Sequence, residues 1–292
     1  LKDLDVDGEA ELEATIKGYV SDHQMPRVQA HLTLDDGEGS YKPLPYTLRD
    51  VELDATADIR LTEGEVSNVE IKNLAAKTKQ SKLAARGRVD DLMGNMLLDL
   101  ALNLDAHLPD FAYFLPQAMT LNGRAKGTAN ARIRLDDLTE MRLEKGKISA
   151  DLDLTDIHYA MDSMVADLPK THATLQLPNP KPSKPKVNWV RIDLTTDKLD
   201  FAMATPLKAA LKASDIQLEA GNVLSKDPVL YAAVGLQTER PVEVAMDSMG
   251  GTVNAPKLKL YAEYNSKDTV GLTKAEAALA CASLDGFYTD TK

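Results

Sequence analysis

The first residues of the chain carry side chains that could bind calcium. Residues 3–8, with the sequence DLDVDG, alternate carboxylates with apolar residues and end in glycine, as in the first half of a calcium loop. The last position of that loop needs a bidentate carboxylate, and it is occupied by Ala14. The alternation of Leu4 and Val6 is also typical of a strand. We therefore predict a strand here and no metal site.

The histidines and the single cysteine form no cluster suited to zinc. The five histidines are His23, His31, His107, His158 and His172. No two of them are three or four residues apart, and none lies beside Cys281. Several alternate with apolar residues, so we expect them on a solvated polar face. Cys281 lies in the apolar stretch 277–284 and is predicted to be a small buried hydrophobic residue.

Motifs of enzymes are absent from the sequence. It contains no nucleophile elbow, no phosphate-binding loop, and no dinucleotide-binding turn before a helix. The many acidic residues leave a glycosidase carboxylate pair open as a weaker alternative. Aromatic residues are only 5% of the chain, with Trp189 the single tryptophan, so there is little surface for stacking sugars. We predict no enzyme, no catalytic residue, no cofactor and no metal.

Composition disfavours further classes of function. There are 34 Lys and Arg against 45 Asp and Glu, and the acidic residues are scattered. Binding of nucleic acid, or of an anionic lipid surface through a basic patch, is therefore disfavoured. Apolar runs are short, so no membrane-spanning helix is expected. The chain begins with Leu1, which we interpret as a piece of a longer protein.

Strict alternation of apolar and polar residues is the main structural signal. In residues 98–108 one face would carry Leu98, Leu100, Leu102, Leu104, Ala106 and Leu108. Similar alternation occurs in residues 28–34, 51–61, 129–135, 148–154, 190–194, 199–203 and 258–264. Glycine-containing turns lie between many of these stretches. The sequence predicts an all-β fold of sequential antiparallel hairpins.

Helices and interruptions are few. We expect one short helix at 109–118, and either a helix or a strand at 272–284, where Thr273 and Glu276 have capping-box spacing. Residues 178–186, rich in Pro and Lys, form a surface loop or linker. This segment either separates an N-terminal β region, 1–177, from a C-terminal β region, 187–292, or is a long hairpin loop within one sheet.

Short motifs recur along the chain. DVELDA at 50–55 matches DIQLEA at 215–220, with a looser match at 156–159. Gly8, Gly87 and Gly123 each precede an alternating stretch. These motifs are either degenerate repeats or the common vocabulary of strand starts.

An apolar strand face needs a cover. The five leucines of residues 98–108 represent about 8–15 kcal/mol of burial free energy, at about 1.5–3 kcal/mol each. The cover is either a second sheet, as in a sandwich or closed barrel, or an apolar ligand in the trough of a curved sheet.

Several segments resemble the AsmA family. They are KLAARGRVDDL at 82–92, the strand at 97–104, DAHLPDFAYFLP at 105–116 and LNGRA at 121–125. The sequence LPNP at 177–180 is similar to Bacteroidetes members. The resemblance covers residues 45–180 best, and its motifs are degenerate.

The resemblance implies a long antiparallel β-sheet curved into an apolar groove, like a taco or half-barrel. It also implies a periplasmic protein, anchored in the inner membrane by a part outside this sequence. The family is related to TamB and bridge-like lipid-transfer proteins, which are linked to outer-membrane assembly and phospholipid traffic. It has no catalytic motif to transfer.

Our hypothesis is that lipid acyl chains lie against the groove. The predicted lining is Val51, Leu53, Ile59, Leu98, Leu100, Leu102, Leu104, Leu152 and Leu154. The alternative is a structural or adhesive β-sandwich that binds a protein or glycan through loops such as 35–40 and 178–185.

Overall fold

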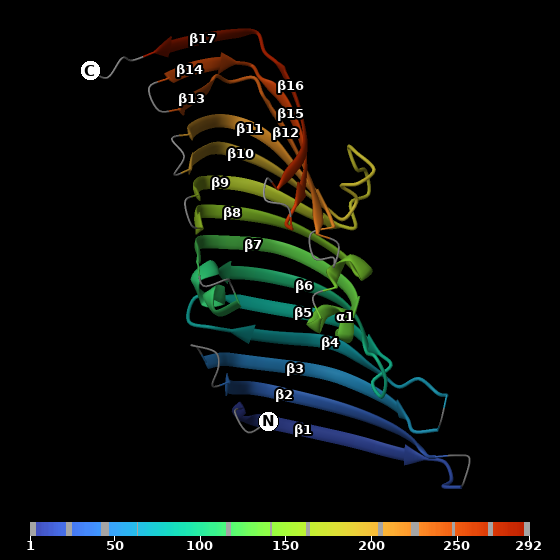
Figure 1. Ribbon diagram of the computed structural model, residues 1–292. Coiled ribbons are helices and arrows are strands. Elements are labelled where there is room, and N and C mark those ends of the chain that lie inside the picture. The colour runs from blue at the N-terminus through green and yellow to red at the C-terminus, as the bar shows by residue number, and fades with distance from the viewer. Residues whose placement is uncertain are drawn as a thin grey trace. The chain divides into compact units, whose positions relative to one another are not determined.

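The structure is a computed structural model. It describes residues 4–21, 25–41, 47–62, 64–114, 118–140, 142–161, 164–203, 207–222, 228–246, 249–267 and 271–288. The predicted all-β fold is confirmed, since strands dominate the described residues (Figure 1). The chain separates into two compact units. Unit 1 is Leu1–Tyr113 with Gly127–Ile148, and unit 2 is Phe114–Lys126 with Ser149–Lys292.

Unit 1 contains a run of antiparallel hairpins. Its strands are β1 (Leu4–Lys17), β2 (Arg27–Tyr41), β3 (Thr47–Arg60), β4 (Asn68–Lys77), β5 (Lys82–Asp90) and β6 (Leu97–His107). Each pairs antiparallel with the next, in chain order (Figure 1). The 3-10 helix η1 (Leu108–Phe114) follows β6. Strand β7 (Met119–Arg134) contributes to both units and leads to α1 (Leu135–Thr139) and the 3-10 turn η2 (Leu143–Lys145).

Unit 2 has a sheet that branches at β11. Its strands are β8 (Lys147–Met161), β9 (Met164–Leu177), β10 (Val190–Met203), β11 (Leu207–Gly221), β12 (Val229–Thr238), β13 (Val242–Met246), β14 (Met249–Asn254), β15 (Lys257–Asn265), β16 (Leu272–Ala280) and β17 (Ser283–Tyr288). The order β9, β10, β11 is antiparallel. Residues 214–221 of β11 pair with β12, which pairs with β15, and β15 pairs with β16. Residues 207–210 of β11 pair with β13, which pairs with β14, and β14 pairs with β17.

The recurring sequence motifs coincide with strand irregularities. Gly8, Gly87 and Gly123 have positive φ inside β1, β5 and β7, and Asp50 and Asp156 have positive φ inside β3 and β8. A Cβ on Gly87 would lie 2.1 Å from the carbonyl oxygen of Asp99 on β6. Gly8, Gly87, Gly123, Asp50 and Asp156 therefore mark positions inside strands where the backbone departs from regular extension, whereas Asp215 of the motif at 215–220 lies in β11 without a positive φ.

Several local predictions are settled by the structure. Residues 272–284 form strands β16 and β17, so the helix alternative is wrong. The stretches 190–194 and 199–203 belong to one strand, β10. The predicted helix at 109–118 is the shorter η1, with residues 115–117 outside the described part. The strand predicted at the calcium-like segment is the start of β1, which begins at Leu4, and residue 3 lies outside the described residues.

The burial predicted for Cys281 is wrong. Cys281 is exposed, between β16 and β17. Among the described residues β16 pairs only with β15, so an apolar sequence at this position lies on an outer strand. Apolar composition alone does not distinguish an outer strand from a central one.

The loop rich in Pro and Lys joins paired strands. Residues 178–186 connect β9 to β10, which pair antiparallel along their length, and the loop lies inside unit 2. A division of the chain into domains at this loop stays a prediction.

Candidate functional site: apolar sheet faces and a polar outer pocket

Apolar side chains of unit 1 form continuous rows across its strands. One row is Ala10, Leu34, Leu53, Leu74, Ala85 and Leu102, each the direct cross-strand partner of the next. The next row is Leu12, Leu32, Ala55, Ile71, Gly87 and Leu100. A third is Ala14, Ala30, Ala57, Val69, Val89 and Leu98. Because direct partners share a face, the three rows make one apolar surface.

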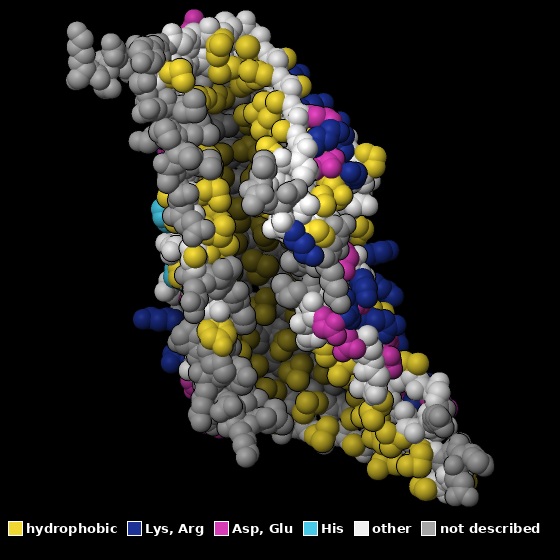
Figure 2. All heavy atoms as spheres, in the orientation of Figure 1, with side chains coloured by type: hydrophobic (Ala, Val, Ile, Leu, Met, Phe, Trp, Pro, Cys, Tyr) yellow, Lys and Arg dark blue, Asp and Glu magenta, His cyan; other side chains and the backbone are white. Residues whose placement is uncertain are grey.

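This surface stays partly open to solvent. Leu53, Leu98, Leu100 and Leu102 are only half-buried, and Leu12 is 65% exposed. The strands β1 to β6 are paired side by side in one sheet, so none of them forms a second layer over the apolar surface. Figure 2 shows hydrophobic side chains gathered in a hollow beside β1 to β3. An exposed apolar surface of this extent is typical of a binding surface.

The predicted lining residues are distributed over both units. Seven of them, Val51, Leu53, Ile59, Leu98, Leu100, Leu102 and Leu104, lie in unit 1 on strands β3 and β6. Leu152 and Leu154 lie in unit 2 on β8. All nine are half-buried. Their role as a lining stays a prediction.

Strand β4 and its apolar residues were not predicted from the sequence. Val69, Ile71 and Leu74 continue the rows of unit 1, but a register shift between Ile71 and Leu74 breaks the alternation. The signal that remained was the pair of apolar stretches on either side of the irregularity.

Unit 2 repeats this arrangement. One row is Ala173, Leu194, Ile216, Leu236, Leu258 and Leu279, and its neighbour is Leu175, Ile192, Leu218, Val234, Leu260 and Ala277. Leu260 and Leu279 are exposed. An apolar face therefore runs from β9 through β10, β11, β12 and β15 to β16, and it is the most open at β15 and β16, whereas Ala173 and Ile216 are buried.

The face opposite the rows of unit 1 is polar and charge-paired. On β3 the carboxylate of Asp58 pairs with Arg27, and Asp50 lies 2.8 Å from the Lys77 ammonium. Arg132 lies 2.7 Å from Asp99. These pairs hold the pKa of Asp58 and Asp50 below the ordinary value, through the hydrogen bonds from Arg27 and Lys77 respectively.

The described histidines each lie beside an aspartate. The pairs are His31 with Asp54, His107 with Asp110, His158 with Asp167, and His172 with Asp153, at 2.6–3.3 Å. His23 lies outside the described residues. Within the described ranges, no group of three or more His, Cys, Asp or Glu side chains is placed to hold a metal ion.

Asp110 organises the start of η1. Its carboxylate accepts hydrogen bonds from the hydroxyls of Thr78 and Ser81, at 2.5 and 2.6 Å, and faces His107. Partial burial raises the pKa of Asp110, but these three hydrogen bonds outweigh it, so the pKa lies below its ordinary value. The network ties η1 to the turn between β4 and β5.

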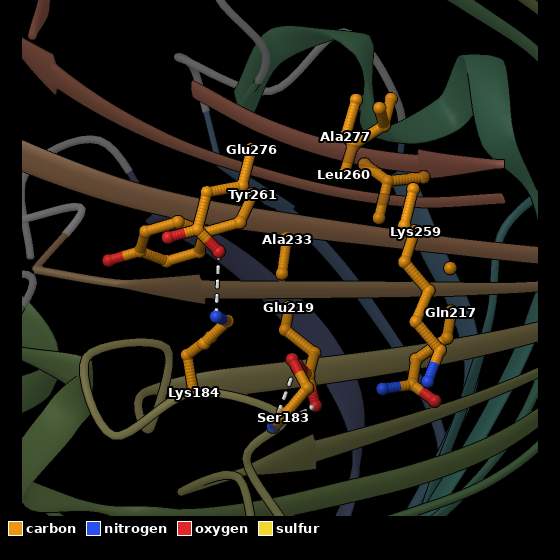
Figure 3. A pocket seen from close by; sticks show the side chains of 13 residues that line it. Ser183, Lys184, Gln217, Glu219, Ala233, Lys259, Leu260, Tyr261, Glu276 and Ala277 are labelled. Atoms are coloured by element: carbon orange, nitrogen blue, oxygen red, sulfur yellow. Dashed lines mark hydrogen bonds and ion pairs between the residues drawn. The ribbon is translucent and has the colours of Figure 1, made fainter. Parts of the chain in front are cut away.

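Unit 2 also has a pocket on the face opposite its apolar rows (Figure 3). The pocket has a volume of about 530 Å³. Gln217, Glu219, Lys259, Tyr261 and Glu276 line it from β11, β15 and β16, and Ser183 and Lys184 line it from the loop before β10. Figure 3 shows Lys184 reaching Glu276 and Ser183 reaching Glu219.

Charge pairs and burial shift the pKa values of two side chains in this pocket, Glu276 and Tyr261. Hydrogen bonds from Lys184 and Lys274 lower the pKa of Glu276 to about 2. Burial and a hydrogen bond to Glu263 raise the pKa of Tyr261 to about 12. Near neutral pH Glu276 is therefore ionised and pairs with Lys184 and Lys274, and Tyr261 is protonated and donates a hydrogen bond to Glu263.

No helix in the described part of the chain is long and apolar enough to cross a membrane. Comparison with known proteins found no matching family model, no matching curated protein and no matching solved structure.

Proposed function

We propose that this chain is a non-enzymatic segment of an AsmA-like envelope protein, which holds or conducts lipid acyl chains on its apolar sheet faces. The observation that carries the proposal is the set of continuous apolar rows across β1 to β6 whose leucines stay half-exposed. Covering this exposed apolar surface with an apolar ligand removes it from water, which lowers the free energy and favours binding.

The dimensions of the rows suit an acyl chain. A row across six strands is about 24 Å long, because neighbouring strands lie about 4.8 Å apart. The hydrocarbon of one bilayer leaflet is about 15 Å thick, half of a core of about 30 Å. An acyl chain laid along a row would therefore contact several strands. Such contact is non-directional, which allows a lipid to be held and still to slide.

The cellular setting follows the resemblance of residues 45–180 to the AsmA family. The protein would be periplasmic and would be anchored in the inner membrane by a part outside this sequence. Its ligand would be a phospholipid or another acyl-chain lipid, in outer-membrane assembly or lipid homeostasis. The charge of −11 agrees with a lipid held through its acyl chains and not through a basic patch.

Native mass spectrometry of protein purified from cells tests the proposal, combined with solvent extraction and lipid analysis of the same sample. We expect phospholipid in stoichiometric amount. A lipid-free mass, in a protein that also takes up no added fluorescent lipid, would show that the proposal is wrong.

A matched pair of variants locates the binding surface. Leu102 lies in an apolar row, and Asn103 beside it is exposed on the opposite face. Leu102→Glu should abolish lipid uptake, whereas Asn103→Glu should leave it unchanged. Circular dichroism of both variants checks that they fold. A folded Leu102→Glu variant that binds lipid normally would remove Leu102 from the lining.

The β-sandwich alternative predicts a different response. In a sandwich Leu102 would belong to a dry core, so that Leu102→Glu would unfold the domain and extraction would yield no lipid. The half-exposure of Leu102 favours the groove.

A further inference from the structure

The segment before β10 packs against the polar face of unit 2. We name residues 178–188 the clasp. It contacts side chains of the row Glu219, Ala233, Tyr261 and Glu276, which are successive cross-strand partners on β11, β12, β15 and β16. Their neighbours along the chain, Leu218, Val234, Leu260 and Ala277, form an apolar row of the opposite face. The clasp and the apolar surface therefore lie on opposite sides of the same strands.

A buried valine anchors the clasp. Val187 is 0% exposed and packs with Ala233 and Tyr261, and Tyr231 packs against this cluster. This is the hydrophobic cluster that forms between the clasp and the sheet, and it includes residues of both β12 and β15. The free energy of this burial holds the clasp on the sheet.

Two lysines extend the contact to the neighbouring strands. The Lys186 ammonium lies 4.7 Å from the centre of the Tyr231 ring and 3.2 Å from the Glu263 carboxylate. The Lys184 ammonium lies 2.7 Å from the Glu276 carboxylate and 5.6 Å from the centre of the Tyr261 ring. Each lysine thus combines an ion pair with a contact to an aromatic ring.

A buried carboxylate fixes the other end of the clasp. The Glu219 side chain is 1% exposed. It accepts hydrogen bonds from the Asn179 amide at 3.1 Å, from the Ser183 backbone N–H at 3.0 Å, and from the Ser183 hydroxyl. Gly221, two residues along β11, has no room for a Cβ because the carbonyl oxygen of Lys186 occupies that space. The clasp therefore fits β11 closely.

We propose that the clasp braces β11, β12, β15 and β16 from the polar face and thereby sets the capacity of the apolar face of unit 2 for acyl chains. A single-layer sheet has no second layer to fix its curvature, and neighbouring strands twist relative to one another over a wide range. A segment that contacts four adjacent strands limits that range. The bracing is independent of the proposed function, whereas the effect on acyl chains rests on it.

Hydrogen exchange of the full chain tests the bracing. The variant Lys184→Ala/Lys186→Ala removes both ion pairs and both ring contacts. Lys181→Ala is the control, since Lys181 lies in the same clasp and its side chain is exposed. We expect about a tenfold loss of amide protection in β15 and β16 of the double variant, because each exposed pair contributes weakly. Protection of β1 to β6 should not change.

Unchanged protection of β15 and β16 in the double variant would overturn the bracing, as would an equal loss in Lys181→Ala. Lipid content by native mass spectrometry tests the second part, with the double variant expected to carry a different amount of lipid from wild type. Equal lipid content, in proteins that do bind lipid, would overturn the coupling to the apolar face. Lipid-free protein in every case would instead contradict the proposed function, and the exchange data would still decide the bracing.

Discussion

Tyr261 and Leu260 are neighbours on β15, yet Tyr261 is 6% exposed and Leu260 is 40% exposed. The tyrosine lies under the clasp, and the leucine lies on the apolar face. At this point of β15 the clasp thus covers the polar face, while the apolar face is open. This is the reverse of an ordinary one-sided sheet, in which the apolar side faces the core.

Substitutions at these two positions should separate stability from binding. Tyr261→Ala removes a buried ring from the cluster around Val187 and should lower the free energy of unfolding by about 3 kcal/mol. Leu260→Thr keeps a residue suited to strands at an exposed position and should change it by less than about 1 kcal/mol. Urea denaturation measures both. A larger loss for Leu260→Thr than for Tyr261→Ala would show that the apolar face is a covered core.

Gly87 should be intolerant of any side chain. Its φ is +151°, and a Cβ would lie 2.1 Å from the Asp99 carbonyl oxygen, so Gly87→Ala should destabilise the protein by about 2–3 kcal/mol. Gly235 is the matched control, because a Cβ there would meet only the Gln217 side chain at 3.5 Å. Gly235→Ala should be close to neutral. Equal effects of the two substitutions, measured by thermal unfolding, would contradict a role for Gly87 in the close approach of β5 to β6.

Uninterrupted alternation located β6 from the sequence, whereas β4 was not predicted because its alternation is broken. Residues 98–108 alternate without interruption, and β6 lies where expected. In β4 the register shift between Ile71 and Leu74 moves apolar residues out of phase, which period-two reasoning cannot follow. The recurrence of glycine at Gly87 is visible in the sequence, but the need for glycine there comes from the close approach of the β6 backbone at Asp99.

The contacts of the clasp with the polar face of unit 2 could not be predicted from the sequence. Residues 178–186 were predicted to be a surface loop, which describes their backbone but not their contacts. The buried carboxylate of Glu219 depends on Asn179, 40 residues away along the chain, and Lys184 of the clasp pairs with Glu276, 92 residues away. The burial of Val187 depends on Ala233 and Tyr261, which lie on β12 and β15. Local patterns contain no information about such contacts, so only the fold brings them together.

Cys281 should react with a thiol reagent in the folded protein. It is exposed between β16 and β17, so a maleimide should label it fully under native conditions. Intact mass after short incubation gives the extent of labelling, and denatured protein gives the maximum. Labelling that requires denaturation would restore the buried position expected from sequence. The Cys281→Ser variant is the control for reaction at other groups.

Acid should weaken the contact between the clasp and β16. Hydrogen bonds from Lys184 and Lys274 lower the pKa of Glu276 to about 2, below its ordinary value of 4.5. A folded pKa below the unfolded pKa stabilises the fold above pH 4.5, and this contribution is lost as the pH falls towards 2. Wild type should therefore be more stable than Glu276→Gln at pH 7, and the difference should shrink between pH 4.5 and 2.

Urea denaturation of both proteins across this pH range measures the difference directly. The nearby Glu263 also has a lowered pKa, through hydrogen bonds from Tyr261 and Lys186, but it is present in both proteins and its effect largely cancels in the comparison. A stability difference that stays constant down to pH 2 would show that Glu276 acts through packing and not through its charge. A difference that vanishes with protonation would instead show that Glu276 acts through its ion pairs with Lys184 of the clasp and Lys274 of β16, since protonation of the carboxylate removes both pairs.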